Sequence, residues 1–427
     1  MELKEGYKQT EVGVIPEDWN TQQAREFSKP VRGGSPRPAG DPRYFNGSFI
    51  PWLTVAALTN IPDSQLTVEE TASHLTEEGS HYSRILDQGT LIIANSGATL
   101  GVAKILGIKC CANDGIAALL NLDDTVSPQF LTYYFNTQTA DLRDRVATGN
   151  GQPNLNTGLI GNIVFPLPPT KAEQEEIAEA LSDADALIES LEQLIAKKRQ
   201  IKQGTMQELL TGKKRLPGFS AEWEVKTFGE VFAYLPTATN SRSDLIEDGE
   251  AYYIHYGDIH TKFHNHLDFM ATKPPMIDRT RCRNAALMKN GDWVMADASE
   301  DYDGVGKSIE ILGLGVGQEA VSGLHTFLLR EKKPTFVPGF KGHLGGLKSL
   351  HEEYLRVATG MKVFGVSKTA LTDLKLPVPH PEEQSAITDI LSDIDKEIAY
   401  LEIKLGKVRQ IKQGMMQELL TGRTRLI

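Results

Sequence analysis

RQIKQG at residues 199–204, followed by MQELLTG at 206–212, occurs a second time at 409–414 and 416–422. Extended outward, residues 173–216 align without gaps onto 383–426 at an offset of 210, and 26 of these 44 positions are identical. An internal repeat of this length is a duplication, and a duplication sets the architecture of a chain before any other feature does.

Each copy of the repeat has the pattern of one long helix. Apolar residues recur at alternating spacings of four and three, which is the seam of a coiled coil. The seam positions are Ile177, Leu181, Ala184, Ile188, Leu191, Ile195 and Lys198 in the first copy, and Ile387, Leu391, Ile394, Ile398, Leu401, Leu405 and Val408 in the second.

The ends of both helices are marked. Proline clusters precede both copies, Thr170 and Glu173 have the spacing of a capping box, and Gly212 and Gly422 stand where a helix stops. Acidic residues lead each helix and basic residues end it, so a parallel pair would place acid beside acid. The sequence therefore predicts an intramolecular antiparallel pair. The alternative is two amphipathic helices packed on separate cores.

The residues outside the repeat predict two globular domains. GVIPEDW at 13–19 is similar to GFSAEW at 218–223, and VATG occurs at both 146–149 and 357–360. Short apolar runs after Gly turns indicate strands. We expect an α+β chain with a pseudo-two-fold, circular organisation: a globular domain over 1–165, a central long helix over 166–216, a second globular domain over 217–376 and a distal long helix over 377–427.

Composition excludes several classes. No signal peptide or membrane-spanning run is present in the sequence, so we expect a cytoplasmic protein without membrane contact. Cys110, Cys111 and Cys282 have neither metal-ligand spacing nor a disulfide pattern. The net charge is −11 and no segment is strongly basic. Any DNA contact must then use local patches, and we expect the isolated chain to hold DNA weakly.

The order of these motifs resembles a Type I restriction-modification specificity (S) subunit. The shared features are the domain, the PLPP-type junction, a helix that starts with EQ and contains LSD, and RQIKQG-M-QELLTG, all repeated once. The resemblance implies two target-recognition domains that read double-stranded DNA, and two spacer helices in an antiparallel coiled coil. It implies two modification (methyltransferase) subunits and restriction (motor-nuclease) subunits as partners in phage defence.

The same resemblance implies a noncatalytic chain that binds no cofactor itself. S-adenosylmethionine, ATP and Mg²⁺ would belong to the partner subunits, which methylate adenine at N6 or cleave DNA. Three alternatives remain at this point: a specificity subunit of a fused Type II-like system, a coiled-coil scaffold without DNA reading, and a lone methyltransferase. The target would be bipartite, because a helix over 171–208 is roughly 57 Å long and limits the spacing of the domain centres to ~17 base pairs.

Candidate DNA contacts in the first half lie in two loops. RGGSPR at 32–37 is a glycine-rich turn with two guanidinium groups that suit guanine or phosphate. GNGQPNLN at 149–156 offers Asn and Gln, which suit adenine, although both are also ordinary turn residues. The candidates are Arg32, Ser35, Arg37, Arg43, Asn150, Gln152 and Asn154.

Candidates in the second half are more dispersed. Ser241-Arg-Ser243 stands at a place comparable to the first loop, and the histidine-dense run 253–266 has the pattern of a strand followed by a turn. A metal site at His260, His264 and His266 is disfavoured because no Cys or Glu-x-x-His pattern accompanies them. The candidate DNA contacts are Arg242, His255, His260, Lys262, Lys307, Lys362 and Lys368.

Two further motifs resemble nucleotide or cofactor loops but lack residues that such loops need. GVGKS at 304–308 resembles the end of a phosphate loop, but the position that needs the first Gly is Asp301. We interpret it as a hairpin with Lys307 as a phosphate contact. ILGLGVG at 311–317 resembles a methyltransferase cofactor loop, but no Asn-Pro-Pro-Tyr follows it.

Overall fold

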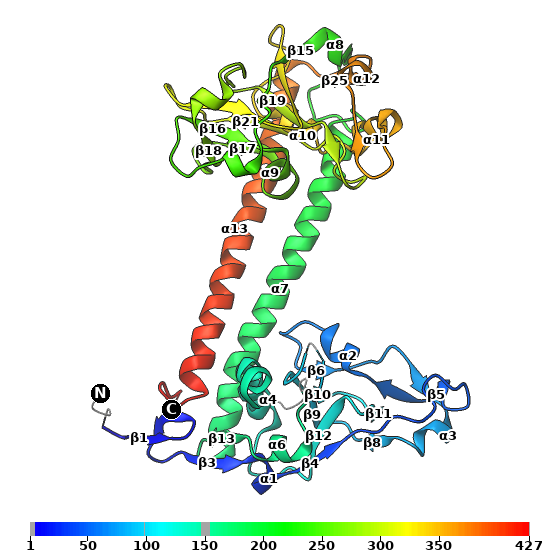
Figure 1. The fold of residues 1–427 in the computed structure, drawn as a ribbon, viewed down its shortest axis with the longest axis vertical. Coiled ribbons are helices and arrows are strands. Elements are labelled where there is room, and N and C mark those ends of the chain that lie inside the picture. The colour runs from blue at the N-terminus through cyan, green and yellow to red at the C-terminus, as the bar shows by residue number, and fades with distance from the viewer. Residues whose placement is uncertain (1–4, 98, 147–153, 427) are drawn as a thin grey trace. The chain divides into compact units, whose positions relative to one another are not determined.

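The computed structural model describes residues 5–97, 99–146 and 154–426. The chain divides into two compact units, Met1–Leu194 with Leu401–Ile427, and Ile195–Tyr400. Each unit joins one globular domain to a part of both long helices (Figure 1). Each unit is therefore described by itself.

The two long helices are α7, Lys171–Leu209, and α13, Pro381–Leu419, with 39 residues each. The Thr170 hydroxyl accepts from the Glu173 backbone N–H at 3.2 Å, as the capping pattern predicts. The Glu173 carboxylate pairs with Arg425 instead of completing the box. Both predicted stops are confirmed, because Gly212 and Gly422 adopt φ of +68° and +67°.

Ion pairs show that the helices are antiparallel within each unit. In the first unit Asp185 pairs with Lys412 at 2.6 Å, and Glu192 pairs with Arg409 at 2.5 Å. The second unit has two more such pairs, Lys198–Glu397 at 2.7 Å and Lys202–Asp395 at 2.5 Å. In both units, residues farther along α7 pair with residues nearer the start of α13. The predicted seam is confirmed too, since every seam position is buried or half-buried.

The first domain is built on two sheets. One has the order β4-β12-β9-β10-β6, and the other has the order β7-β5-β11-β8. The strands of these sheets are β4 (Lys29–Arg32), β5 (Phe45–Leu53), β6 (Thr67–Val68), β7 (His74–Leu75), β8 (Arg84–Leu86), β9 (Leu91–Ala94), β10 (Ala103–Leu106), β11 (Cys110–Ala112) and β12 (Ile116–Leu120). The helical segments are α1 (Ala24–Phe27), α2 (Val55–Thr59), α3 (Glu77–Ser80), α4 (Pro128–Thr137), α5 (Thr139–Asp141), the π-helix η1 (Leu142–Val146) and α6 (Thr157–Gly161).

The second domain repeats the topology of the larger sheet. Its five-stranded sheet has the order β15-β23-β19-β21-β17, and the smaller sheet has the order β18-β16-β22. The last pair of each larger sheet, β10–β6 and β21–β17, is parallel, while the other pairs are antiparallel. The match of the two larger sheets, strand for strand, means that the duplication included the domains as well as the helices.

The strands of the second domain are β15 (Phe232–Leu235), β16 (Ala251–Ile254), β17 (Asn265–Asp268), β18 (Met276–Ile277), β19 (Trp293–Ala296), β20 (Ala298–Ser299), β21 (Ser308–Leu312), β22 (Glu319–Ser322), β23 (Thr326–Glu331) and β24 (Phe364–Gly365). Its helical segments are α8 (Phe228–Val231), η2 (Arg242–Asp244), α9 (Tyr256–Thr261), η3 (Arg279–Cys282), α10 (Phe340–Leu344), α11 (Lys348–Val357) and α12 (Lys368–Thr372).

Each domain begins and ends on one strand pair. In the first unit β3 (Asn20–Gln23) pairs antiparallel with β13 (Val164–Leu167), and in the second β14 (Glu224–Thr227) pairs with β25 (Lys375–Val378). Outside these pairs, β1 (Tyr7–Thr10) forms a hairpin with β2 (Gly13–Pro16). The strand that leaves each domain thus leads directly into a long helix.

A buried glutamine fixes the start of each long helix. The Gln174 side chain accepts from Ser127 N at 2.8 Å and donates to Thr125 O at 3.3 Å. Gln384 does the same with Val337 N at 2.8 Å and Thr335 O at 3.0 Å. The offset of 210 therefore extends from the helices to the loops that receive them.

A glutamate next to each of these glutamines holds the end of the other helix in its unit. Glu383 is 1% exposed, and it accepts from Arg215 at 2.7 Å and from the Trp223 indole N–H at 2.8 Å. Glu173 pairs in the same way with Arg425, which also binds Asp18. A circular organisation follows for the first unit, because the end of the chain is tied to its beginning.

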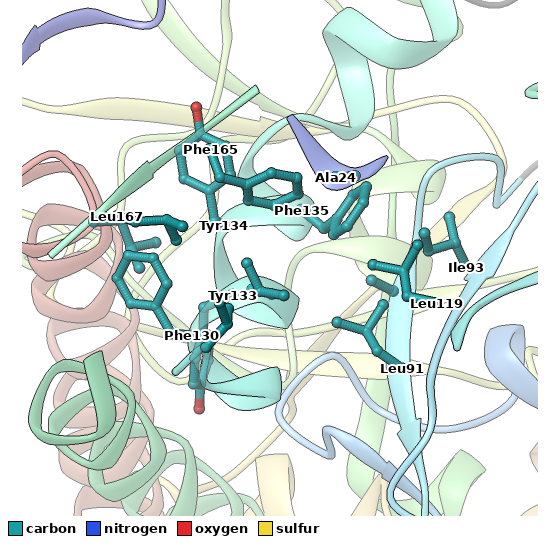
Figure 2. Close-up of a cluster of buried hydrophobic side chains, with 14 of the residues drawn as sticks. Ala24, Leu91, Ile93, Leu119, Phe130, Tyr133, Tyr134, Phe135, Phe165 and Leu167 are labelled. Carbon is teal, nitrogen blue, oxygen red and sulfur yellow. The ribbon is translucent and has the colours of Figure 1, made fainter. Parts of the chain in front are cut away.

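Aromatic side chains from several elements form the core of the first domain. Figure 2 shows Phe130, Tyr133, Tyr134 and Phe135 of α4 beside Phe165 of β13. Ile177 and Leu181 of α7 and Leu419 and Leu420 at the end of α13 belong to the same buried cluster. The helices are thus part of the domain core, and burial of this apolar area is what holds them to it.

The described helices can be compared with the length and composition of a membrane span. Within residues 5–97, 99–146 and 154–426, no helix combines the length and apolar character that a bilayer span requires.

Glu383→Gln should destabilise the protein by about 2 kcal/mol, because the buried Glu383 carboxylate loses its charge-assisted hydrogen bonds from Arg215 and Trp223. Urea unfolding followed by circular dichroism measures the loss. The control is Glu175→Gln, which removes an exposed pair with Lys171 and should cost at most about 0.5 kcal/mol. Equal effects of the two changes would contradict the role given to Glu383.

His343→Leu should make the free energy of unfolding of the second unit less dependent on pH. Burial, then His266 and Lys202, lower the pKa of His343 from 6.5 to about 3. A lowered pKa in the folded state means that stability is complete above the unfolded pKa and declines as the pH falls below it. Between pH 7 and pH 5 the wild type should lose about 2 kcal/mol through this group. The variant should lose correspondingly less, and an unchanged pH dependence of urea unfolding would refute the assignment.

Candidate nucleic-acid interface

Loops gather at one end of the two sheets in the first unit, and we call this end the loop edge. Backbone hydrogen bonds tie it together: Gly34 N to Ala112 O, Asn95 N to Gly115 O, and Leu155 N to Asn95 O, each 2.9 Å. The segment after β4, the turn between β11 and β12 and the segment before α6 therefore meet beside the end of β9.

The second unit has the same loop edge at the equivalent strand ends. Ala238 N donates to Ser322 O at 2.8 Å, Asp297 N to His325 O at 3.1 Å, and Val366 N to Asp297 O at 2.8 Å. The backbone arrangement is thus repeated, whereas Asn95 is replaced by Asp297 and Gly115 by His325.

Three of the predicted residues in the first unit converge on Asp114. The Ser35 hydroxyl donates to its carboxylate at 2.5 Å, Arg37 lies 3.5 Å from the other oxygen, and Arg32 Nε donates to the Asp114 backbone carbonyl at 2.6 Å. The Ser35 hydrogen bond, more than the two guanidinium charges, lowers the pKa of Asp114 below its ordinary value. Arg37 remains 73% exposed, so its guanidinium is held at one end and open to solvent.

The tight approach of this loop explains one of its glycines. A Cβ on Gly33 would collide with the backbone carbonyls of Asn113 and Ala112. Only glycine therefore lets the Arg32–Arg37 loop lie against the β11–β12 turn.

The other candidate residues of the first unit differ in whether they lie at the loop edge. Asn154 forms a bridge with Ser96 and so lies at the loop edge, next to Asn95, whose amide donates to Asp114 O at 3.2 Å. Arg43 does not join the cluster, because its guanidinium pairs with Asp41 at 2.7 Å. Asn150 and Gln152 lie outside the described residues.

In the second unit the carboxylate that collects cations is Asp258. It is fully buried, and Arg242 at 3.1 Å and Lys262 at 3.0 Å both pair with its Oδ1. His255 caps α9 by accepting from Gly257 N at 3.1 Å, and burial followed by the Arg242 charge lowers its pKa. The histidine is thus held neutral beside the guanidinium.

The structure corrects the local fold expected for the histidine-rich run. β16 ends at Ile254, and α9, Tyr256–Thr261, follows it where a turn was expected. The reason is the His255 cap, which accepts from the N–H of Gly257, the second residue of the helix. His260 Nε2 lies 3.1 Å from Ala298 O, and Lys307 Nζ donates to His260 O at 3.4 Å.

The two remaining lysines lie near the same loop edge. Lys362 is exposed in the loop between Thr359 and β24, which pairs with β20. The Lys368 ammonium lies 5.7 Å from the ring centroids of Tyr234 and Phe327. Both are therefore placed to present positive charge beside the loops.

Two of the three histidines considered for a metal site lie close to backbone carbonyl groups. His260 contacts Ala298, and His266 Nε2 lies 2.7 Å from Gly339 O. In the part of the chain that the structure describes, no three His, Cys, Asp or Glu side chains gather as a metal site would need.

Residue-type reasoning missed several side chains of these edges. Asp114 and Asp258 are acids, which a search for DNA contacts passes over, although they position the cations. The Tyr302 ring stacks on Phe364 with centroids 4.2 Å apart, and Tyr302 is 60% exposed. The NDG sequence at 113–115 is a signal for a tight turn and could have directed attention to Asp114.

Comparison with known proteins finds similarity to one class of protein. Residues 16–201 match the family model described as the Type I restriction modification DNA specificity domain. The Type I restriction enzyme MjaVIII specificity subunit of Methanocaldococcus jannaschii is 23% identical over 99% of this chain and 97% of its own length. The MjaIX specificity subunit of the same organism is 30% identical over 43% of this chain and 42% of its own length.

Solved structures agree in fold. An S subunit of a Type I restriction-modification system from M. genitalium superposes with a TM-score of 0.55 at 13% identity, covering 98% of both chains. A chain from a structure of the type I R-M system, described in terms of complex assembly and conformational transition, gives 0.58 at 16% identity over 96% of this chain and 99% of its own. The sequence and the fold of this chain are thus similar to those of Type I restriction-modification specificity subunits.

Proposed function

We propose that this chain reads a bipartite double-stranded DNA target, with one loop edge for each half of the target. The observation that carries the proposal is the repeated backbone framework of the two edges. Matching hydrogen bonds hold both, at Asn95 in the first and Asp297 in the second, yet the side chains that project from them differ. A constant framework with varied side chains suits two domains that read different base sequences.

The chemistry of each edge suits contact with DNA. Arg32 and Arg37 are held by Asp114, and Arg242 is held by Asp258, so these guanidinium groups are partly oriented before DNA arrives. Oriented arginines suit guanine edges or phosphates. Arg32, Ser35, Arg37 and Asn154 are the proposed contacts in the first unit, and Arg242, His255, His260, Lys262, Lys307, Lys362 and Lys368 in the second.

We also propose that the helices carry methyltransferase subunits, with restriction subunits added to that complex. Large apolar side chains stay exposed on the helix faces turned away from the seam. In the first unit these are Leu187 and Leu194 on α7, seven residues apart, and Ile403 and Ile411 on α13, with Ile403 61% exposed. Apolar residues in a row on a soluble helix mark a surface that a partner covers.

The acidic charge of the chain fits this division of labour. The whole chain has a net charge of −11, which opposes binding to the DNA phosphates outside the loop edges. The partner subunits would supply the remaining positive surface around the duplex.

The direct test uses the chain with a methyltransferase subunit from the same system and S-adenosylmethionine on random-sequence DNA. Reading of the methylated positions should give adenines in an asymmetric, two-part sequence. Methylation without sequence preference would favour the scaffold alternative, and methylation by this chain alone would favour the lone methyltransferase.

Removal of one heptad from each helix, residues 192–198 and 400–406, should shorten the unread spacer of the target by about three base pairs. Seven helical residues span about 10.5 Å, and a base pair rises about 3.4 Å. Sequencing of methylated random DNA gives the spacer. The same spacer in the shortened protein would rule out a role for helix length.

Arg32→Gln should relax the preference in one half of the target and leave the other half intact, while Arg242→Gln should do the reverse. Loss of one oriented guanidinium should cost roughly tenfold in discrimination at the affected base pair. The controls are Lys109→Gln and Arg356→Gln, which remove exposed surface pairs with Asp87 and Glu353. If either arginine variant changes both halves equally, one edge does not read one half.

A further inference from the structure

Lys307 and Ser308 of the GVGKS segment line a pocket in the second unit. The pocket lies within the second unit, encloses about 310 Å³, and is bordered by the start of β21, by the turn between α10 and α11 and by Gln203 of α7. At roughly 30 Å³ per water molecule, this space accepts a small hydrated anion.

The charged and polar groups at this pocket favour an anion. Lys307 and Lys348 both line it, together with His264 and His351. Asp303 is the opposing acid at the rim, and Glu352 lies 3.9 Å from the Lys348 ammonium, an exposed pair that binds it weakly.

A helix N-terminus opens onto the same space. α11 has ten residues, and its N-cap is Leu347, which has no side-chain acceptor for the first N–H groups. Gly345 and Gly346 come directly before it and line the pocket. Free N–H groups and the positive end of the helix dipole attract a negative group at such a position.

An independent sign of a missing ligand is Ser308. This residue is only 8% exposed, lines the pocket, and its hydroxyl has no hydrogen-bond partner in the structure. A Cβ on Gly345 would collide with that hydroxyl, so only glycine lets the turn before α11 lie this close to Ser308. A buried hydroxyl without a partner is costly unless something binds it.

We propose that this pocket binds a phosphate group through Lys307, Lys348, the Ser308 hydroxyl and the N-terminus of α11. The site differs from a phosphate loop of a nucleotide-binding enzyme, because its helix is α11 and does not follow GVGKS. The phosphate could be that of a DNA backbone or of a small phosphate compound, and the test below separates the two. The proposal does not depend on sequence reading by the loop edges.

The test is calorimetric titration of the full chain with pyrophosphate. The wild type should bind, and the double variant Lys307→Gln/Lys348→Gln should bind at least about tenfold more weakly, because two charge-assisted contacts are lost. Ser308→Ala should weaken binding by a few-fold, and Lys273→Gln, an exposed lysine of the same unit, should leave it unchanged.

The variant Gly345→Ala tests whether pyrophosphate binding depends on the shape of the pocket as well as on its charge. It leaves every charge in place but fills the space before Ser308, so it should also weaken binding, with an unchanged circular dichroism spectrum showing that the fold persists. Displacement of pyrophosphate by a random-sequence duplex would assign the site to a DNA phosphate. Simultaneous binding of both would assign it to a small phosphate compound.

Equal titration of the wild type and the double variant, or no binding by the wild type, would overturn the proposal. Sequence preference in the methylation assay is measured separately, so failure here leaves the loop edges untouched. The reverse also holds, since pyrophosphate binding needs no methyltransferase.

Discussion

The antiparallel pairing of α7 and α13 is the constraint on which the rest of the structure depends. Asp185 with Lys412 and Asp395 with Lys202 are the same ion pair in the two copies, one in each unit. An acid near the start of one helix can meet a base near the end of the other only if the chains run in opposite directions. The duplication thus made a chain in which the two copies of the long helix pair with each other.

Buried polar clamps turn this pairing into a rigid attachment of each domain. Gln174 and Gln384 satisfy loop backbone groups of their own domains, while Glu173 and Glu383 hold the end of the partner helix. Because these groups are buried, each would be costly if left without its partner. Exposed side chains at the loop edges, such as Arg37, are less constrained and could diverge between the two copies.

Much of the fold could be predicted from the sequence because the helices follow a simple rule. A four-three seam, marked caps and a charge gradient were enough for two antiparallel helices. The loop edges were harder, since Arg32 and Arg37 owe their position to Asp114, 77 or more residues away, and no local pattern shows that contact. His255 misled in another way, because its capping role made a helix from a segment whose composition suggested a turn.

The pairing direction is the central claim, and cross-linking measures it directly. Cysteines in place of Glu192 and Arg409, which are 2.5 Å apart at their side-chain ends, should be joined within one chain by a short bifunctional maleimide. Cysteines in place of Glu179 and Asp389, equivalent positions of the two copies, should not be joined. A parallel, in-register pair would give the opposite pattern, with 179 linked to 389 and 192 not linked to 409, and would contradict the account.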